Sequence, residues 1–377
     1  MQIGIPAETL AGETRVAATP ETVKKFVAMG CKVVVQAGAG VAASCIDSAY
    51  EAAGASIAAS AADTLSASDI VLKVAAPTAD EVALMKQGAT VLAAFAPHQN
   101  THFDAYAAKG LTCVAMELIP RITRAQSSDI LSSQANVAGY KAVLMAANEY
   151  AGLFPMMMTA AGTIKPARAV ILGVGVAGLQ AIATAKRLGA VVEASDLRPA
   201  AREQVESLGG RWLDVPMSEE EAAKALSTGG YAWQPSPEYI RDQAAVVDKA
   251  VSNANVVITT AQIPGRKAPT LVKAETVAKM KPGSIIIDMA VSSGGNVEGS
   301  QLDQIVVTEN GVRIVGIGNI PALVATEASA LYARNMLNFL APMHNKETSE
   351  IVLNREDDMV KPTLIVDAGT VNYQKPN

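Results

Sequence analysis

Three glycines, Gly173, Gly175 and Gly178, follow the apolar run at residues 170–172 and open an Ala-rich stretch. This GxGxxG spacing is typical of the turn that joins a strand to a helix in dinucleotide sites. The first glycine permits a tight bend, the second lets the backbone approach a pyrophosphate, and the third lets the helix pack closely on the strand. The helix N-terminus then favours the phosphate charge. The spacing predicts a dinucleotide site, and a tight turn without a ligand is the alternative.

A carboxylate follows at the position that this kind of site requires. Asp196 lies 23 residues after Gly173, beyond the next apolar run. A carboxylate there accepts hydrogen bonds from the ribose hydroxyls of NAD and repels a 2′-phosphate. Asp196 therefore predicts NAD, whereas the nearby Arg198 leaves NADP open as the alternative.

A polar segment at residues 121–132 reads Arg-Ile-Thr-Arg-Ala-Gln-Ser-Ser-Asp-Ile-Leu-Ser. If it is helical, Gln126, Asp129 and Ser132 lie along one edge, at i, i+3 and i+6. This edge offers an amide, a carboxylate and a hydroxyl, but no group that titrates near neutral pH. It therefore suits the holding of a carboxamide ring better than the movement of protons. The alternative is a solvated helix start with a cap.

Two loops after apolar runs complete the candidate site, at residues 259–265 and 288–295. Ligands in open α/β sheets bind beyond the carboxyl ends of the strands. We therefore expect both loops to form walls of the cofactor site, with ordinary turns as the alternative.

The elements that position these residues alternate between short apolar runs and amphipathic helical stretches, in two successive halves. This alternation predicts an α/β fold of two Rossmann-like doubly wound parallel-sheet domains with a cleft between them. The expected strands are residues 2–6, 32–37, 70–74, 90–96 and 111–116 in the first half, and 169–172, 191–194, 256–260, 284–289 and 313–316 in the second.

The domain boundaries follow from two long helices, which we expect at residues 127–150 and 322–340. The second helix is expected to return to the first domain, so that this domain comprises 1–135 and 322–377 and the second comprises 136–321. A Pro- and Gly-containing insertion at 214–243 predicts an irregular surface flap. The three consecutive methionines at 156–158 are predicted to fill the core, and a mobile functional surface is the alternative.

Composition excludes several classes of function. The chain has 377 residues, a net charge of −5 and no basic tract, which argues against nucleic acid as a partner. No apolar stretch is long enough for a membrane span, and the N-terminus does not resemble a signal peptide, so we expect a cytoplasmic chain without direct membrane insertion. The three cysteines and three histidines lack metal-ligand spacing, so we expect no metal.

Taken together, these residues resemble the family shared by alanine dehydrogenase and the NAD(H)-binding component of proton-translocating transhydrogenase. The resemblance covers essentially the whole chain. Its hallmarks are residues 13–20, 121–140, 158–162, 173–178 and 259–265.

The resemblance implies a role for individual residues around a bound NAD(H). The nicotinamide would be positioned by Gln126 with Arg121, Asp129 and Ser132, and Arg124 would also contact the cofactor. The remaining cofactor contacts are Gly173, Gly175, Val176, Ala177 and Gly178 at the pyrophosphate, Asp196, Leu197 and Arg198 at the ribose, Gly230, Tyr231 and Gln243 in the mobile loop, and Gln262, where the family usually has Leu, beside the adenosine.

The resemblance further implies the NAD(H)-binding component of a proton-translocating NAD(P) transhydrogenase. Such a chain passes hydride from NADH to NADP⁺ on a partner subunit, and the transfer is coupled to proton movement. The implied partners are a second copy of the chain, forming a homodimer, together with NADP(H)-binding and membrane-spanning subunits that attach it peripherally to the inner membrane.

Two other functions stay open. An alanine-dehydrogenase-like enzyme is favoured by Arg15 and Lys73, which hold a substrate carboxylate in that branch. It is opposed by Ala94 and Ser292, which match the positions of the branch's catalytic His and Asp, because reductive amination needs proton transfer. The third function is that of a non-catalytic NAD(H)-binding module.

Overall fold

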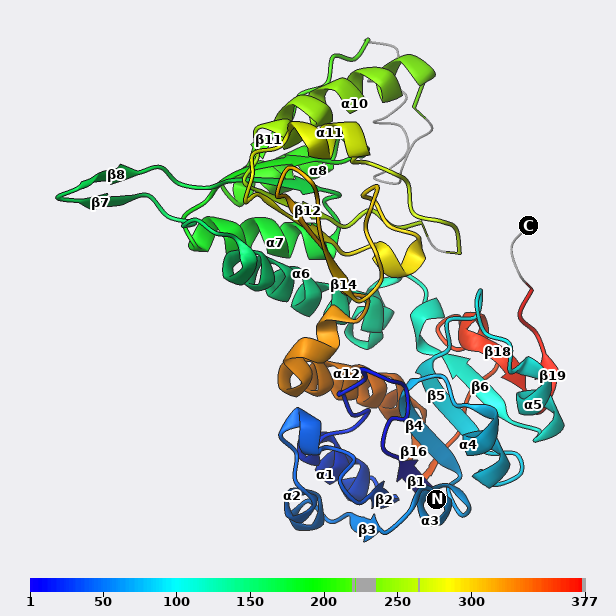
Figure 1. Ribbon diagram of the computed structural model, residues 1–377. Coiled ribbons are helices and arrows are strands. Elements are labelled where there is room, and N and C mark those ends of the chain that lie inside the picture. The colour runs from blue at the N-terminus through cyan, green and yellow to red at the C-terminus, as the bar shows by residue number, and fades with distance from the viewer. Residues whose placement is uncertain (219–220, 222–234, 264, 375–377) are drawn as a thin grey trace. The chain divides into compact units, whose positions relative to one another are not determined.

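The computed structural model describes residues 1–218, 221, 235–263 and 265–374. The chain divides into two compact units, one made of Met1–Gln134 and Pro321–Asn377 and the other of Ala135–Ile320 (Figure 1). The two internal boundaries between the units each lie one residue earlier than expected. The second unit is thus inserted in sequence within the first, and each unit has its own sheet and core.

The sheet of the first unit has the order β19-β18-β6-β5-β4-β1-β2-β3. Strands β1 to β6 run parallel in the order 3-2-1-4-5-6, which defines a doubly wound fold. The strands are β1 (Gln2–Ile5), β2 (Lys32–Gln36), β3 (Ser56–Ala58), β4 (Ile70–Ala75), β5 (Thr90–Ala94), β6 (Thr112–Ala115), β18 (Leu364–Asp367) and β19 (Thr370–Val371).

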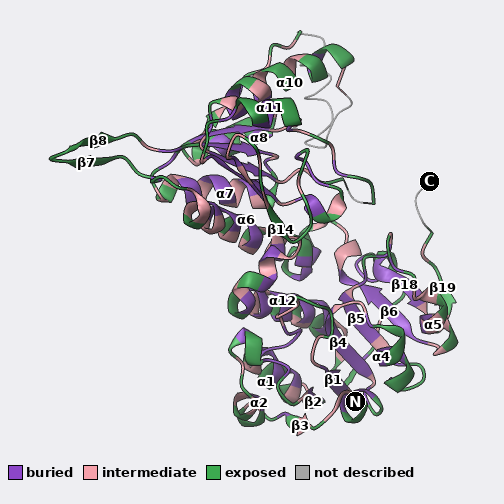
Figure 2. Ribbon diagram, in the orientation of Figure 1, coloured by how far each residue is buried: buried purple, intermediate pink, exposed green. Residues whose placement is uncertain are grey.

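Both faces of this sheet are buried, because apolar side chains alternate along each strand. In β4, for example, Leu72 joins one apolar cluster and Val71 the other. The first cluster includes residues of α1 (Pro20–Ala28), α2 (Asp47–Ala52) and α12 (Ala325–Leu340). The second includes residues of α3 (Ala61–Leu65), α4 (Ala79–Leu84) and α5 (Phe103–Ala108). The sheet therefore lies between two helical layers, and its central strands β4, β5 and β6 are mostly purple in Figure 2.

The C-terminal tail, for which the sequence predicted no fixed element, completes the sheet. Strand β18 pairs antiparallel with β6, and β19 pairs antiparallel with β18. A short antiparallel ribbon, β16 (His344–Asn345) with β17 (Glu350–Ile351), precedes them.

The sheet of the second unit has the order β11-β10-β9-β12-β13-β15-β14, and only β14 is antiparallel. Its first five strands again follow the order 3-2-1-4-5. The strands are β9 (Arg168–Leu172), β10 (Val191–Ser195), β11 (Arg211–Trp212), β12 (Val256–Thr259), β13 (Ile285–Asp288), β14 (Gln304–Val307) and β15 (Arg313–Gly316).

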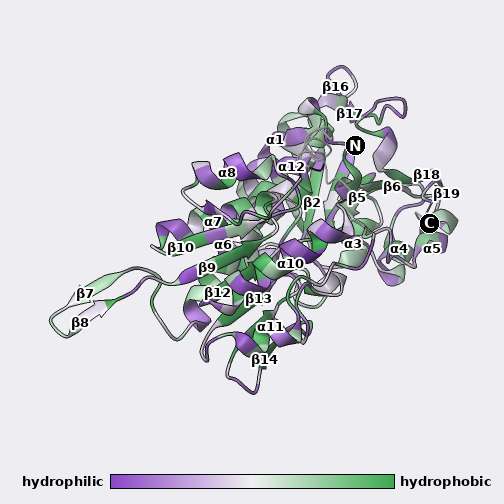
Figure 3. Ribbon diagram, turned by 90° about the horizontal axis from the view of Figure 1, so that it is seen from above, coloured by the Kyte–Doolittle hydropathy of each residue, from purple (hydrophilic) through white to green (hydrophobic). Residues whose placement is uncertain are grey.

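Helices cover both faces of this second sheet as well. One apolar cluster contains residues of α6 (Ile130–Glu149), α7 (Val176–Arg187) and α8 (Ala201–Ser207). The other contains residues of α10 (Pro237–Ser252) and α11 (Ala274–Lys279). Hydropathy follows this layering, since the central strands carry the hydrophobic side chains (Figure 3). Two doubly wound α/β units are therefore confirmed.

Three expectations about local structure need correction. Helix α6 begins at Ile130 rather than 127, because Thr123–Ser128 forms the 3₁₀ helix η3 and Asp129 is extended. The end of the expected loop 214–243 is helical, because Ser236 caps α10 and Pro237 occupies its first turn.

The methionines at 156–158 do not fill the core, which is the third correction. They lie on a β-hairpin formed by β7 (Met157–Thr159) and β8 (Gly162–Ile164), which extends away from its unit (Figures 1 and 2). Met158 is 75% exposed and Met156 is 59% exposed. The apolar character of this segment therefore belongs to a surface.

Two further observations concern the cysteines and the length of the helices. Cys31, Cys45 and Cys113 are free thiols. Across the described residues, no helix combines the length and the apolar character that a membrane crossing needs.

Candidate functional site

The glycine-rich turn lies where β9 ends and α7 begins, next to β12. Gly173 has a φ of +92°, which only glycine adopts readily. A Cβ on Gly178 would lie 2.0 Å from the Gly173 carbonyl oxygen, so only glycine lets α7 start this close to the strand. The Thr260 hydroxyl donates to the same carbonyl oxygen at 3.0 Å and fixes the turn from the β12 side.

The N-terminus of α7 is open to an anion. Its N-cap residue is Gly175, which has no side chain to cap the helix. A Cβ built on Gly175 meets nothing within 4 Å. The first N–H groups of a helix have no acceptor within it, so those of Val176, Ala177 and Gly178 can donate to a phosphate. The loop therefore fits a pyrophosphate.

Asp196, at the end of β10, is tied to the glycine-rich turn. Its Oδ2 accepts from the Val174 N–H at 2.6 Å, and its Oδ1 accepts from the Arg198 N–H and Nε at 2.8 and 2.9 Å. The Asp196 carboxylate raises the pKa of Arg198 above its ordinary value. Because this carboxylate engages the guanidinium, Arg198 is not poised for a 2′-phosphate. The arrangement favours NAD, with Leu197, 36% exposed, beside it.

A buried polar pair holds the loop that follows β12. The Asn296 side chain accepts from the Ala261 N–H at 3.1 Å and donates to the Ala261 and Pro269 carbonyls at 2.9 and 2.7 Å. Asp288, at the end of β13, accepts from the Asn296 and Ala290 N–H groups. The loops after β12 and β13, which were expected to line the cofactor site, are therefore joined to each other by hydrogen bonds. Sequence reasoning missed Asn296, whose signal was an Asn directly after two glycines.

Besides Asp196 and Arg198, two more of the predicted cofactor-binding residues in this unit form side-chain hydrogen bonds: Gln262 and Gln243. Gln262 donates to the Met289 carbonyl at 3.1 Å, which joins the loops after β12 and β13. Gln243, in α10, donates to the Ser195 hydroxyl at 3.5 Å, beside Asp196. Gly230 and Tyr231 lie outside the described residues.

The segment that was expected to hold the nicotinamide starts in the first unit. Asp129 caps α6, because its Oδ1 accepts from the Ser132 N–H at 2.9 Å and its Oδ2 accepts from the Ser132 hydroxyl at 2.6 Å. Arg121 and Gln126 are exposed, and neither side chain forms a hydrogen bond or ion pair within the described residues. The continuous edge expected for Gln126, Asp129 and Ser132 is absent, because Gln126 lies in η3 and not in α6.

The Arg124 side chain, predicted to contact the cofactor, has partners within its own unit. Its guanidinium pairs with Asp357 and Asp358, from the C-terminal stretch of the same unit. The pair lowers the pKa of Asp357 below its ordinary value. We therefore see Arg124 as an anchor of the 121–129 segment.

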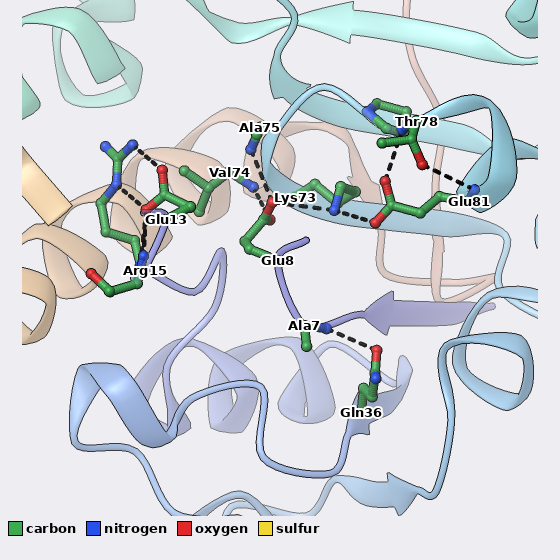
Figure 4. A network of polar contacts seen from close by, with 12 residues as sticks. Ala7, Glu8, Glu13, Arg15, Gln36, Lys73, Val74, Ala75, Thr78 and Glu81 are labelled. Atoms are coloured by element: carbon green, nitrogen blue, oxygen red, sulfur yellow. Dashed lines mark hydrogen bonds and ion pairs between the residues drawn. The ribbon is translucent and has the colours of Figure 1, made fainter. Parts of the chain in front are cut away.

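In the first unit, the side-chain carboxylate of Glu8 lies at the end of the sheet where ligands bind in doubly wound folds. Glu8, after β1, accepts from the Val74 and Ala75 N–H groups of β4 at 2.6 and 3.3 Å (Figure 4). Lys73 pairs with Glu8 at 3.2 Å and with Glu81 at 2.7 Å. Burial raises the pKa of Glu8, although Lys73 opposes the shift. This point of the sheet, between β1 and β4, already holds an internal ion cluster.

Arg15 also has internal partners. It forms a two-point contact with Glu13, through Nε at 2.8 Å and Nη2 at 2.6 Å (Figure 4). Its Nη1 donates to Gln134 Oε1 at 2.8 Å. Retention of Arg15 and Lys73 therefore does not require a substrate carboxylate, which weakens the argument for amino-acid oxidation.

A buried carboxyl group in the first unit had no signal in the sequence. Glu117, in the 3₁₀ helix η2 (Met116–Leu118), accepts from the Ala96 N–H at 2.6 Å. Its other oxygen is buried and has no partner among the described residues. Burial raises the pKa of Glu117 to about 7.

In the described portion of the chain, no group of three or more His, Cys, Asp or Glu residues could hold a metal ion.

The order of the strands, the open helix N-terminus and the tethered Asp196 define a dinucleotide-binding α/β protein. The chain belongs to the alanine dehydrogenase/PNT family. The model for the N-terminal domain of that family matches residues 4–138, and the model for its C-terminal domain matches residues 142–374.

Individual relatives and structures agree with this assignment. The chain is 52% identical over 378 residues to an NAD(P) transhydrogenase alpha subunit of Rhodospirillum rubrum, with 98% of this chain and 97% of the relative covered. The structure of transhydrogenase from Sinorhizobium meliloti has a TM-score of 0.89 at 47% identity, covering 98% of this chain and 100% of that one. An L-alanine dehydrogenase structure has a TM-score of 0.78 at 27% identity, covering 99% and 97%. Family and fold together support an NAD(H)-binding component with an oxidoreductase role.

Proposed function

We propose that this chain is the NAD(H)-binding component of a proton-translocating NAD(P) transhydrogenase. The observation that carries the proposal is the 52% identity, along nearly the whole chain, to a transhydrogenase alpha subunit of almost the same length. The turn at Gly173–Gly175–Gly178 and the adjacent Asp196 supply a cradle for NAD(H) in the second unit.

The chain's own residues have defined tasks in this proposal. The N–H groups of Val176 and Ala177 hold the pyrophosphate, and Asp196 accepts from a ribose hydroxyl. Gln126 and Arg121, whose side chains have no partners within the described residues, are available to hold a carboxamide ring. A bound nicotinamide supplies the hydride, which leaves NADH with its electron pair and reduces NADP⁺ on the partner, so that NAD⁺ and NADPH form.

The segment around Gln126 needs no general acid for this reaction, because hydride passes between two cofactors. Asp129 and Ser132 are bonded to each other, which suits a role in shaping the segment rather than in proton transfer. Ala94 and Ser292, at the positions of the His and Asp in alanine dehydrogenases, supply no titratable group.

The proposal includes partners. It places NADP(H) and the proton pathway on separate subunits, through which this chain attaches peripherally to the inner membrane on its cytoplasmic side. It also includes a homodimer, which the exposed methionines of the β7–β8 hairpin support, since an apolar arm on a surface is typical of an interface.

The test combines the purified chain, its NADP-binding partner domain, NADH and a spectrally distinct NADP⁺ analogue, with each component omitted in turn. Rapid analogue reduction only with both proteins present is the expected result. NADH binding without reduction would reject transhydrogenation in favour of a binding module. NADH oxidation on addition of pyruvate and ammonium would instead identify an alanine-dehydrogenase-like enzyme.

A further inference from the structure

Side chains of helix α12 form hydrogen bonds with the backbone of the segment that carries Gln126 and Asp129, and these contacts lie within the first unit. The Asn335 side chain donates from Nδ2 to the Ser127 carbonyl at 2.8 Å. Its Oδ1 accepts from the Ser133 hydroxyl at 2.6 Å. One amide therefore joins the end of η3 to the first turn of α6, on either side of Asp129.

Asn335 is well placed for a fixed contact, because its side chain is almost inaccessible. The residue is 7% exposed, whereas Asn338, one turn later, is exposed. Asn338 donates to the same Ser127 carbonyl at 3.1 Å. Of the two donors, only Asn335 is held away from water, and it also contacts the second point at Ser133.

The segment has another attachment to α12 through Gln134. The Gln134 amide donates to the Ala328 carbonyl at 3.1 Å and accepts from Arg15. Backbone and side-chain contacts therefore fix residues 127 to 134 at several points. Gln126 directly precedes the first of them, and its side chain has no hydrogen bond of its own within the described residues. These contacts therefore fix the backbone from which the Gln126 side chain starts.

The apolar side of α12 does not depend on Asn335. Tyr332, Met336 and Phe339 are buried in the core of the first unit and attach the helix to the sheet. Loss of the Asn335 amide should therefore loosen the segment around Ser127 and leave the helix in place.

We propose that Asn335 is a positioning residue for hydride transfer, which acts by holding the Ser127 carbonyl and thereby the backbone position of Gln126. The inference rests on the proposed function. It predicts that Asn335 affects the rate of hydride transfer far more than the affinity for NADH, because, in the described part of the chain, Asn335 has no contact with the turn at Gly173 or with Asp196, which supply the proposed pyrophosphate and ribose contacts.

Asn335→Asp is the decisive substitution, because it keeps the shape and the acceptor for Ser133 but replaces the donor to Ser127 with a carboxylate. At saturating NADH we expect kcat for transfer to the NADP⁺ analogue to fall at least about tenfold, with NADH affinity changed less than about twofold. The activity relative to wild type should rise as the pH falls, because a protonated Asp can donate again to the carbonyl. A purely stabilising contact would not produce this pH profile.

Asn338→Asp is the matched control, since its carboxylate can turn to solvent, and kcat should stay within about twofold of wild type. Hydrogen–deuterium exchange supplies a readout that needs no activity. Residues 121–134 should exchange faster in Asn335→Asp, with the rest of the first unit unchanged.

The two proposals fail in different ways. A wild-type chain that binds NADH but transfers no hydride overturns the proposed function. If wild type transfers hydride and Asn335→Asp keeps full kcat, or shows unchanged exchange in residues 121–134, the role of Asn335 alone is rejected. Equal losses of kcat and NADH affinity at every pH would reject it as well.

Discussion

Glu117 combines burial with an oxygen that has no partner in the part of the chain that the structure describes, and this makes the stability of the first unit depend on pH. Burial raises its pKa from 4.5 to about 7, against the opposing N–H groups of its own backbone and of Ala96 and Phe95. Between these two values the carboxyl is neutral in the folded chain and ionised in the unfolded chain. Unfolding then releases a proton, so stability falls as the pH rises through this window.

Glu117→Gln should remove this dependence, because the amide stays neutral. The free energy of unfolding of the variant should exceed that of wild type by up to about 3 kcal/mol at pH above 7, with the difference shrinking towards pH 4.5. Urea titrations at a series of pH values measure it. Parallel stability curves for the two chains would contradict the assignment.

Asp129 has a structural contact that must be separated from its proposed role in the site. Asp129→Ala removes the cap of α6 and should cost about 1 kcal/mol of stability. Asp129→Asn keeps an acceptor for the Ser132 N–H and should cost less than half of that. If transfer activity follows stability across the two variants, Asp129 acts only as a cap. If Asn also loses activity, the charge itself is needed.

At the scale of elements, the glycines of the turn offer a matched pair. Gly175→Ala meets open space at a φ of −78°, so the variant should fold normally but lose at least about tenfold in NADH affinity, because the methyl group faces the ligand. Gly178→Ala places its Cβ 2.0 Å from the Gly173 carbonyl oxygen, so the turn must open.

Thermal unfolding with and without NADH distinguishes the two glycine variants. Gly175→Ala should match wild type without NADH and gain less from adding it. Gly178→Ala should be less stable in both conditions. Tight NADH binding by Gly175→Ala would mean that the dinucleotide does not lie against this turn.

The same elements show what a sequence can predict. The central strands were predicted because buried parallel strands consist of apolar runs, and the turn at Gly173 because its spacing serves a single geometry. The start of α6 was misplaced because Ser127, Ser128 and Asp129 are all good N-caps. In the structure Asp129 caps α6, while the Ser127 carbonyl accepts from Asn335 and Asn338 of a distant helix, which no local pattern predicts. The prediction for the methionines at 156–158 was wrong because composition does not distinguish a buried apolar residue from an exposed one.

The candidate site could be predicted from the sequence only in part. Asp196 could be predicted from its distance along the chain, but the Arg198 and Val174 contacts that occupy its carboxylate could not. Asn296 and Asn335 act through contacts with distant segments. Asn335 has no local pattern that marks it, and the two glycines before Asn296 indicate a turn but not its contacts.

At the scale of the whole molecule, the β7–β8 hairpin is the surface on which the proposed homodimer is most easily tested. Replacing Met156, Met157 and Met158 with Ser should shift the chain from dimer to monomer at micromolar concentration, because the apolar area available for association falls. Sedimentation velocity measures the change. Val352→Ser, at an exposed apolar residue next to the β16–β17 ribbon, is the control and should leave the dimer intact. An unaffected dimer in the methionine variant would exclude the hairpin as the main interface.

The insertion of one unit within the other has a consequence for synthesis on the ribosome. Helix α12 and strand β18, which the first unit needs to cover its core and complete its sheet, are translated only after the entire second unit. At elongation rates of about 5–20 residues per second, the first 134 residues wait on the order of 10–45 s for them. During that time, the apolar surface that Tyr332 and Phe339 later cover is exposed on the nascent chain, so we expect the second unit to fold first and the first unit to depend on a chaperone until release.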